Sequence, residues 1–185
     1  MITPITKEPL REIVDDFAKG IRARKTTKVT PEFAVINFRD EKIKGIQRRI
    51  ESVPIELLRY RKDNGRIASD VMDYEYLNGV LDEKDKAAQE VLRGFLFKKH
   101  PEMTEVLMKS IAHTGQNEPA IVTCDGFLIN GNRRKMALEA LLEKDKGNES
   151  YKYLKVVILP GREDEGGPPT LLEIERLENR YQLQS

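Results

Sequence analysis

Four consecutive residues, Gly131-Asn132-Arg133-Arg134, combine residue types that bind phosphate groups. They follow an apolar run and precede a helical pattern, so the junction presents unpaired backbone N–H groups at the positive end of a helix dipole. Arginine in a first helical turn is unfavourable by itself, by roughly 0.3–1 kcal/mol per charge. An anion at this point would explain the two arginines, and Gly131 would let the backbone approach it closely.

A second interpretation of the same four residues needs no ligand. Asn132 belongs to the residue types that cap helix N-termini through their side chains. Arg133 and Arg134 would then pair with carboxylates on the surface. The segment alone does not decide between the two interpretations.

The last predicted helix carries a carboxylate on its apolar side. Its apolar residues recur at helical spacing, and Glu178 falls within the same arc. Because a buried carboxylate without a partner is costly, Glu178 needs one. The partner is either an arginine or a Mg²⁺ ion that accompanies a nucleotide, and Asn179 would then add a side-chain oxygen to the metal.

Other catalytic chemistry has little support in the sequence. Cys124 is the only cysteine, which excludes an intrachain disulfide and a Cys-x-x-Cys metal site. His100 and His113 are too few for a histidine-rich zinc site. No cluster of carboxylates suggests the two catalytic metals of a nuclease.

The composition is that of an ordinary globular domain. Of the 185 residues, 39% are hydrophobic and 34% are charged, with a formal net charge of +1. Modules that bind duplex DNA are usually clearly basic, so the charge balance does not favour DNA as the main ligand. No apolar run approaches the ~18 residues of a membrane span, and the first residues lack the order of a signal peptide. We therefore expect a cytoplasmic protein with no membrane partner.

Helical periodicity predicts the elements that would position these residues. The expected helices cover 8–19, 82–99 with Asp82 as the N-cap, 101–115, 135–144, and a last helix that opens with a capping box at 170–173. In the third of them, the expected buried stripe consists of Val106, Leu107 and Ile111.

The strand patterns complete the predicted fold. Strands are expected at 33–38, 53–58, 120–124, 127–130 and 155–159. Asp125-Gly126 is typical of a two-residue hairpin turn between the third and fourth of these strands. Strands and helices alternate irregularly, which favours an α+β fold with a mixed sheet packed against helices.

Four stretches of the sequence, in order, resemble the N-terminal domain of the ParB chromosome- and plasmid-partition proteins. They are 53–58 with the turn Asn64-Gly65-Arg66, 110–122, 125–137 with the Gly131 to Arg134 box, and Leu177-Glu178-Asn179 followed by Gln182. The resemblance implies a ParB/sulfiredoxin-like fold over residues 50–185, with a helical insertion at about 68–102. Residues 1–49 would form an N-terminal extension with a helix and a strand.

The resemblance also implies a function. In that family the arginine box contacts nucleotide phosphates, and the Glu-Asn box helps to hold Mg²⁺ and the triphosphate of CTP. It therefore implies that Gly131, Asn132, Arg133 and Arg134 bind phosphate, that Arg66 and Gln116 line the pocket, and that Glu178 and Asn179 face the metal. The expected ligand is CTP or ATP with Mg²⁺, and the expected role is DNA maintenance in partition, plasmid, phage or defence processes.

The sequence departs from the family at functional positions. Asn132 stands where the family has a glutamate, which puts nucleotide hydrolysis in doubt. Arg180 replaces a usual apolar residue and one extra residue precedes Gln182, so the identity of the nucleotide stays open. Cys124 lies outside the phosphate loop in which sulfiredoxins hold their cysteine, and this disfavours peroxiredoxin repair.

Two other functions remain open at this point. One is an enzyme on the same pocket, an NTP hydrolase or a small-molecule kinase, with a nuclease less favoured. The other is a DNA-binding module that uses the basic residues without a nucleotide. The apolar face of the helical insertion predicts core packing, and the alternative is contact with a partner or with a second copy in a homodimer.

Overall fold

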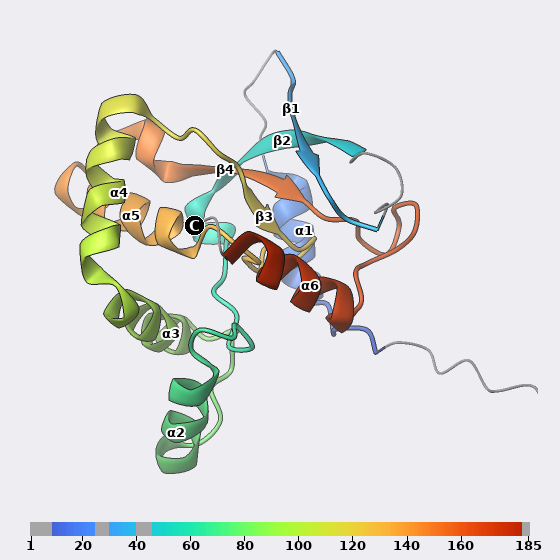
Figure 1. Ribbon diagram of the computed structural model, residues 1–185, viewed down its shortest axis with the longest axis horizontal. Coiled ribbons are helices and arrows are strands. Elements are labelled where there is room, and N and C mark those ends of the chain that lie inside the picture. Colours follow the sequence, from blue (N-terminus) through green and yellow to red (C-terminus); the bar gives the residue numbers. More distant parts are fainter. Residues whose placement is uncertain (1–8, 25–29, 40–45, 183–185) are drawn as a thin grey trace, which may run out of the picture.

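A computed structural model describes residues 9–24, 30–39 and 46–182. These residues form a four-stranded sheet with helices on both faces (Figure 1), which confirms the predicted α+β class. The helices are α1 Asp15–Ala23, α2 Ala68–Asn78, α3 Lys86–Lys99, α4 Pro101–Thr114, α5 Asn132–Lys144 and α6 Leu171–Gln182. The strands are β1 Glu32–Ile36, β2 Ile46–Pro54, β3 Ala120–Val122 and β4 Tyr153–Ile158, and short 3₁₀ helices cover Ile55–Leu57 and Glu149–Lys152.

The sheet is mixed, as the sequence predicts. Its strand order is β1-β2-β4-β3, and β3 runs parallel to β4 while the other neighbours are antiparallel. The predicted N-terminal extension contributes β1 and the first residues of β2 to this sheet. No helix of the described ranges has the length and apolar character that crossing a membrane requires.

Alternation along the strands divides the interior into two cores. Val156 points into a core formed with α3, α4 and α5, whereas Val157 points into a second core formed with α6. The same alternation holds in β3, where Ala120 and Val122 face the first core and Ile121 faces the second. Since successive strand residues face opposite sides, a short apolar strand serves both layers. The turn before α5 lies between the two cores, because Ile129 belongs to the second core and Met136 of α5 belongs to the first.

Several helix ends follow from local sequence chemistry. Pro101 is the first residue of α4, and Gly115, with a φ of 78°, ends it. The predicted capping box of α6 is confirmed, because the Glu173 N–H donates to Thr170 Oγ1 at 3.1 Å and the Thr170 N–H donates to Glu173 Oε1 at 3.0 Å. These features fix both ends of α4 and the start of α6.

Other predicted boundaries are wrong. The first helix begins at Asp15 rather than near residue 8, which lies outside the described residues, and it continues to Ala23. Helix α3 begins at Lys86, because the carboxylate of Asp82 instead accepts the Lys84 N–H at 3.0 Å. Strand β2 ends at Pro54, whose residue type has no N–H to continue a ladder, and a 3₁₀ turn follows.

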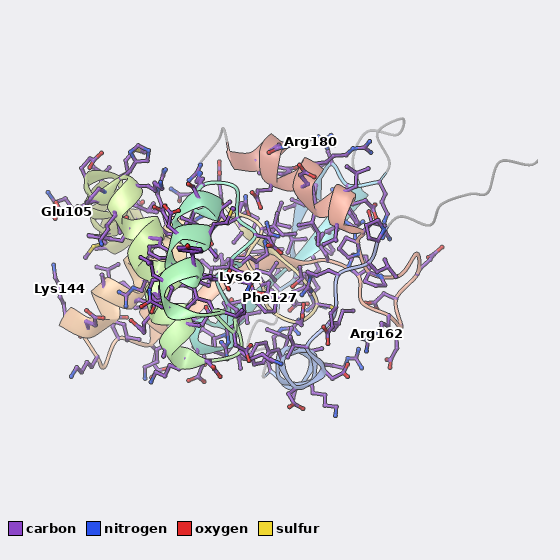
Figure 2. All side chains as sticks on the ribbon, turned by 90° about the horizontal axis from the view of Figure 1, so that it is seen from below. Lys62, Glu105, Phe127, Lys144, Arg162 and Arg180 are labelled. Carbon is purple, nitrogen blue, oxygen red and sulfur yellow. The ribbon has the colours of Figure 1, made fainter. Side chains whose placement is uncertain are left out.

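The predicted hairpin occurs, but its turn and its second strand differ from the prediction. The Gly126 N–H donates to Thr123 O at 3.0 Å, and the Thr123 N–H donates to Phe127 O at 2.9 Å, so residues 124–126 form a three-residue loop instead of the predicted two-residue turn Asp125-Gly126. Beyond the turn, the chain forms only isolated bridges, at Phe127 and Leu128. Phe127 is buried near the centre of the molecule (Figure 2).

The predicted helical insertion consists of two helices of different character. Helix α3 buries Ala88, Leu92 and Leu96 in the first core, so its apolar face is used for packing, as predicted. Helix α2 was not predicted, and it projects from the lower edge of the view in Figure 1. Its residues Tyr76 and Leu77 are exposed.

Candidate functional site

The turn that precedes α5 is held in one conformation by its neighbours. Asn130 Oδ1 accepts the Ile121 N–H at 2.6 Å, which ties the turn to β3. Gly131 has a φ of 86°, and a Cβ atom there would lie 2.4 Å from the Cβ of Ala120. The Lys135 N–H donates to Gly131 O at 3.1 Å and starts the helical ladder. Only glycine fits this position, for steric and conformational reasons together.

The first turn of α5 therefore presents its backbone N–H groups without a protein cap. Gly131 is the N-cap residue and provides no side-chain hydrogen bond. Asn132, Arg133 and Arg134 occupy the first three helical positions, whose N–H groups have no partner within a helix. The predicted alternative, in which the Asn132 side chain caps the helix, is wrong.

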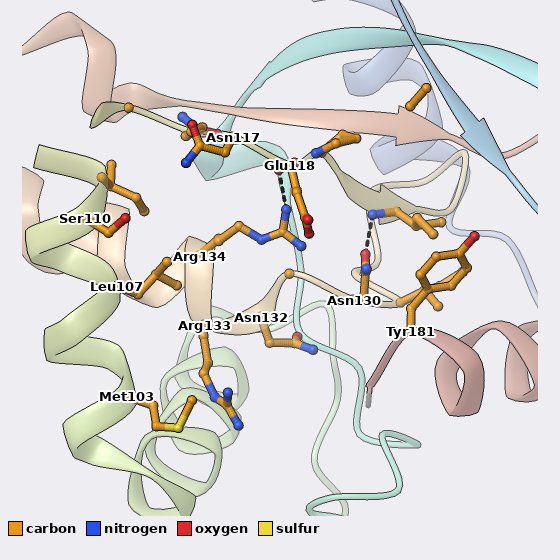
Figure 3. Close-up of a pocket in the computed structure, with 18 of the residues that line it drawn as sticks. Met103, Leu107, Ser110, Asn117, Glu118, Asn130, Asn132, Arg133, Arg134 and Tyr181 are labelled. Atoms are coloured by element: carbon orange, nitrogen blue, oxygen red, sulfur yellow. Dashed lines mark hydrogen bonds between the residues drawn. The ribbon is translucent and has the colours of Figure 1, made fainter. Parts of the chain in front are cut away.

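A cavity of about 560 Å³ opens in front of this turn (Figure 3). Its walls come from β1, from the outer face of α4, from the loop 115–119 and from the end of α6. Volumes of 300–1,000 Å³ are typical of sites for small molecules and cofactors. The cavity therefore has the size of a ligand site.

Three arginines line the cavity, against one acid, Glu118, in the described part of the chain. Burial lowers the pKa of Arg134, and the attraction of Glu118 offsets only part of that effect. Its guanidinium group donates to the backbone carbonyl of Glu118. Burial also lowers the pKa of Arg66, and the nearby positive charge of Arg133 lowers it further. In the ranges that the structure covers, no carboxylate forms an ion pair with Arg133 or Arg134.

Part of the cavity lining is apolar. Met103, Val106 and Leu107 of α4 and Val35 of β1 belong to it. Val106 and Val35 are 67% and 58% exposed, so the apolar surface remains accessible at the cavity mouth. The prediction that Val106 is buried is wrong, because it lies on the outer side of the α4 stripe. Tyr181 closes one end, and its hydroxyl accepts the Asn37 N–H at 3.2 Å.

All six residues that the sequence assigns to the phosphate site and its pocket line this cavity. They are Gly131, Asn132, Arg133, Arg134, Arg66 and Gln116. The side chain of Gln116 is already engaged, since it donates to Tyr153 O at 2.8 Å and accepts the Lys155 N–H at 3.0 Å. Gln116 therefore shapes the wall, while Arg133 and Arg134 form no ion pair with a carboxylate of the described ranges.

The two predicted metal ligands lie elsewhere. Glu178 is buried against the guanidinium group of Arg61, and its Oε1 accepts the Gly65 N–H at 2.7 Å. Asn179 is exposed and is not part of the cavity lining. The structure thus favours the arginine partner that the sequence left open for Glu178. A metal role for Glu178 and Asn179 stays a prediction without support from this geometry, and the described residues hold no group of three or more potential ligands from His, Cys, Asp and Glu.

Glu178 nevertheless influences the cavity through the backbone. It holds the N–H of Gly65, the residue before Arg66, and Asn64 Oδ1 accepts the Arg66 N–H at 3.0 Å. These two bonds fix the turn that carries Arg66 to the cavity. The residues of this turn are consecutive in the sequence, whereas the Glu178 side chain that anchors it belongs to α6, far along the chain.

Some lining residues were missed by sequence reasoning. Asn130, Glu118 and Tyr181 all line the cavity. Asn130 sits one residue before the predicted box, which is the only local signal that would have included it. Glu118 and Tyr181 have no such signal, because only the folded chain brings them to α5.

Cys124 lies away from the cavity, near Gly161 and Asp164. Burial raises the pKa of its thiol, and the charge of Asp125 adds to this shift. A thiol with a raised pKa is a poor nucleophile at neutral pH. Comparisons of the chain with protein-family models, with curated proteins and with solved structures found no match.

Proposed function

We propose that this chain is a nucleotide-binding domain whose cavity holds the phosphates of a nucleoside triphosphate at the N-terminus of α5. One observation carries the proposal: Arg133 and Arg134, without carboxylate partners in the described ranges, meet the uncapped first turn of α5 at a cavity of about 560 Å³. Backbone N–H groups, the helix dipole and guanidinium groups are the three contributions from which phosphate sites are built.

The mixed lining of the cavity supports a nucleotide over a simple anion. Its cationic groups come from α5 and Arg66, and its apolar groups include Met103, Val106 and Val35. A nucleotide also combines charged groups, its phosphates, with a flat base. Tyr181 adds an aromatic ring at the end of the cavity, of the kind on which a base can stack.

Within this class, we propose a ParB-like domain that binds CTP or ATP and acts in DNA maintenance. The support is the order of the resembling stretches, since three of the four contribute residues to one cavity, at Arg66, at Gln116 and at Gly131 to Arg134. Mg²⁺ would arrive with the triphosphate. Glu118 is the carboxylate nearest to such a complex among the described lining residues, and it would act on the metal through water or directly.

The geometry favours nucleotide binding over the two other functions that the sequence left open, an enzyme and a DNA-binding module. Within its described lining, the cavity has a single carboxylate and no histidine or cysteine, so it offers few groups for acid–base or nucleophilic catalysis. The three arginines lie in a concavity of ligand size, whereas contacts to duplex DNA need cationic groups on an accessible face.

Titration calorimetry with CTP, ATP, GTP and UTP, each with and without Mg²⁺, tests the proposal. We expect saturable binding of at least one triphosphate, and a loss of about 10- to 100-fold in affinity for Arg133→Ala, the usual range for a charged hydrogen bond. Arg176→Ala is the matched control, because Arg176 is an exposed arginine of α6 outside the cavity lining.

Two results would contradict the proposal. The first is the absence of saturable binding for all four triphosphates. The second is an equal loss of affinity in Arg133→Ala and Arg176→Ala, which would mean that bulk charge, and not the cavity, attracts the ligand.

A further inference from the structure

Two asparagine amides at the phosphate turn are not satisfied by the protein. Asn132 Oδ1 is buried and has no hydrogen-bond partner. Asn130 is only 8% exposed, its Oδ1 is fixed by the Ile121 N–H at 2.6 Å, and its Nδ2 has no acceptor in the described part of the chain. Both residues line the cavity, and Figure 3 shows them between Arg134 and Tyr181.

Structural roles do not account for these two groups. Asn132 is the first residue of α5 and makes no capping bond, because Gly131 occupies the cap position. A buried acceptor without a donor destabilises the folded protein. Asn130 needs only its oxygen to hold the turn, so its NH₂ group is left over. Both residues line the same cavity, and the enclosed Asn132 oxygen meets a ligand there when its side chain turns toward the cavity.

Their position limits which part of a ligand they can reach. The amide of Asn132 is attached to the same first turn of α5 whose N–H groups meet the phosphates in the proposed function. In a nucleotide, the group next to the phosphates is the sugar, and the base lies beyond it. A sugar hydroxyl both donates and accepts a hydrogen bond. A ribose therefore offers hydroxyl groups that match both amides at this distance from the phosphates.

We propose that Asn132 and Asn130 recognise the ribose hydroxyls, and that this chain selects ribonucleotides over deoxyribonucleotides. A ribose hydroxyl donates to Asn132 Oδ1, and the same or the neighbouring hydroxyl accepts from Asn130 Nδ2. A deoxyribose leaves the buried Asn132 oxygen unpaired, and sites with an unpaired buried group reject such analogues strongly. The inference rests on the proposed function, because it needs the phosphates at α5.

Calorimetry with a matched series of ligands tests the inference. The series is the ribonucleoside triphosphate that the wild-type protein binds best, its 2′-deoxy, 3′-deoxy and 2′,3′-dideoxy forms, and inorganic triphosphate. For the wild-type protein, we expect the dideoxy form to bind at least about tenfold more weakly than the ribonucleotide. The single deoxy forms show which hydroxyl is recognised.

Variants assign the selectivity to a residue. Asn132→Ala should bind the ribonucleotide and its dideoxy form with equal affinity, and it should bind inorganic triphosphate as the wild-type protein does. Asn117→Ala is the matched control, since Asn117 is an exposed asparagine that also lines the cavity, and it should retain the tenfold selectivity. Circular dichroism confirms that each variant is folded.

The outcomes separate this inference from the proposed function. Equal binding of ribo and dideoxy forms by the wild-type protein overturns the inference while the proposed function stands, and that comparison needs no variant to fold. Weaker binding of inorganic triphosphate by Asn132→Ala also overturns it, because Asn132 would then act on the phosphates. A wild-type protein that binds no triphosphate at all removes the proposed function itself.

Discussion

Glu178 and Arg61 form an ion pair in the interior, with each side chain only 7% exposed, although 117 residues separate them in the sequence. The second carboxylate oxygen of Glu178 accepts the Gly65 N–H at 2.7 Å. The pair thus joins α6 to the turn that carries Arg66. A residue that resembles part of a metal-binding box is, in this fold, a support for one wall of the cavity.

Glu178→Ala should therefore reduce stability rather than act on a metal. Removal of one partner leaves the Arg61 charge buried alone, which costs about 3–5 kcal/mol in known cases. Urea unfolding followed by circular dichroism measures the loss. Glu175→Ala, at an exposed position of the same helix, should change stability by less than about 0.5 kcal/mol. If Glu178→Ala keeps normal stability but loses Mg²⁺-dependent binding, a metal-binding role for Glu178 is supported instead.

Gly131→Ala should destabilise the fold by at least about 2 kcal/mol, since a left-handed φ and a steric clash act together. The clash is with the Cβ of Ala120, at 2.4 Å from the added carbon. Gly79→Ala separates the two effects, because Gly79 has a φ of 90° with no atom within 4 Å of an added Cβ. Thermal unfolding of both variants should rank Gly131→Ala as the less stable. Equal losses would show that the clash is relieved by movement of β3.

Arg133→Gln should make the ligand-free protein more stable while it weakens binding. The change removes a positive charge from the positive end of α5 and from the vicinity of Arg66, whose pKa that charge lowers. The gain should be about 0.3–1 kcal/mol in thermal unfolding at low salt, without phosphate in the buffer. Added salt should shrink the gain. A less stable variant would mean that Arg133 makes a stabilising contact.

Glu173→Gln should remove one source of acid sensitivity from α6. Burial alone would raise the pKa of Glu173, but hydrogen bonds from Arg39 and Thr170, together with the Arg39 charge, outweigh it and lower the pKa. A carboxyl with a lowered folded-state pKa stabilises the protein fully above its unfolded value of about 4.3, and this contribution is lost as the pH falls through the folded-state pKa.

Unfolding in urea at pH 7 and at pH 3 tests this expectation. The stability of the wild-type protein should exceed that of Glu173→Gln by about 0.2–1 kcal/mol at pH 7, because glutamine can still cap α6 but cannot form the ion pair with Arg39. The difference should narrow at pH 3. A difference that stays constant between the two pH values would show that the carboxylate charge does not contribute.

The predictable features of the fold are those set by neighbouring residues. Pro101 and Gly115 mark the ends of α4, and Thr170 with Glu173 marks the start of α6, because caps depend on residues within one turn. The junction at Gly131 is predictable for the same reason. Its glycine, its first-turn arginines and its helix are consecutive in the chain.

The features that could not be predicted depend on contacts between distant segments. The partner of Glu178 is Arg61, and nothing in the spacing of α6 identifies it. Helix α2 escaped prediction because Tyr76 and Leu77 are exposed, so its apolar residues do not form one buried stripe. The apolar lining of the cavity comes from α4 and β1, which are distant from each other in the sequence.

The side chain of Gln116 has a consequence for how the cavity receives a molecule. By bonding to both Tyr153 O and the Lys155 N–H, it occupies ladder positions on β4 just ahead of β3 and anchors the loop before that strand. The Gln116 side chain and the Asn130 anchor on β3 together hold two walls of the cavity in place before a ligand binds. Little conformational entropy is then lost on association, and the rate of entry should be set by diffusion and charge attraction instead of by a rearrangement.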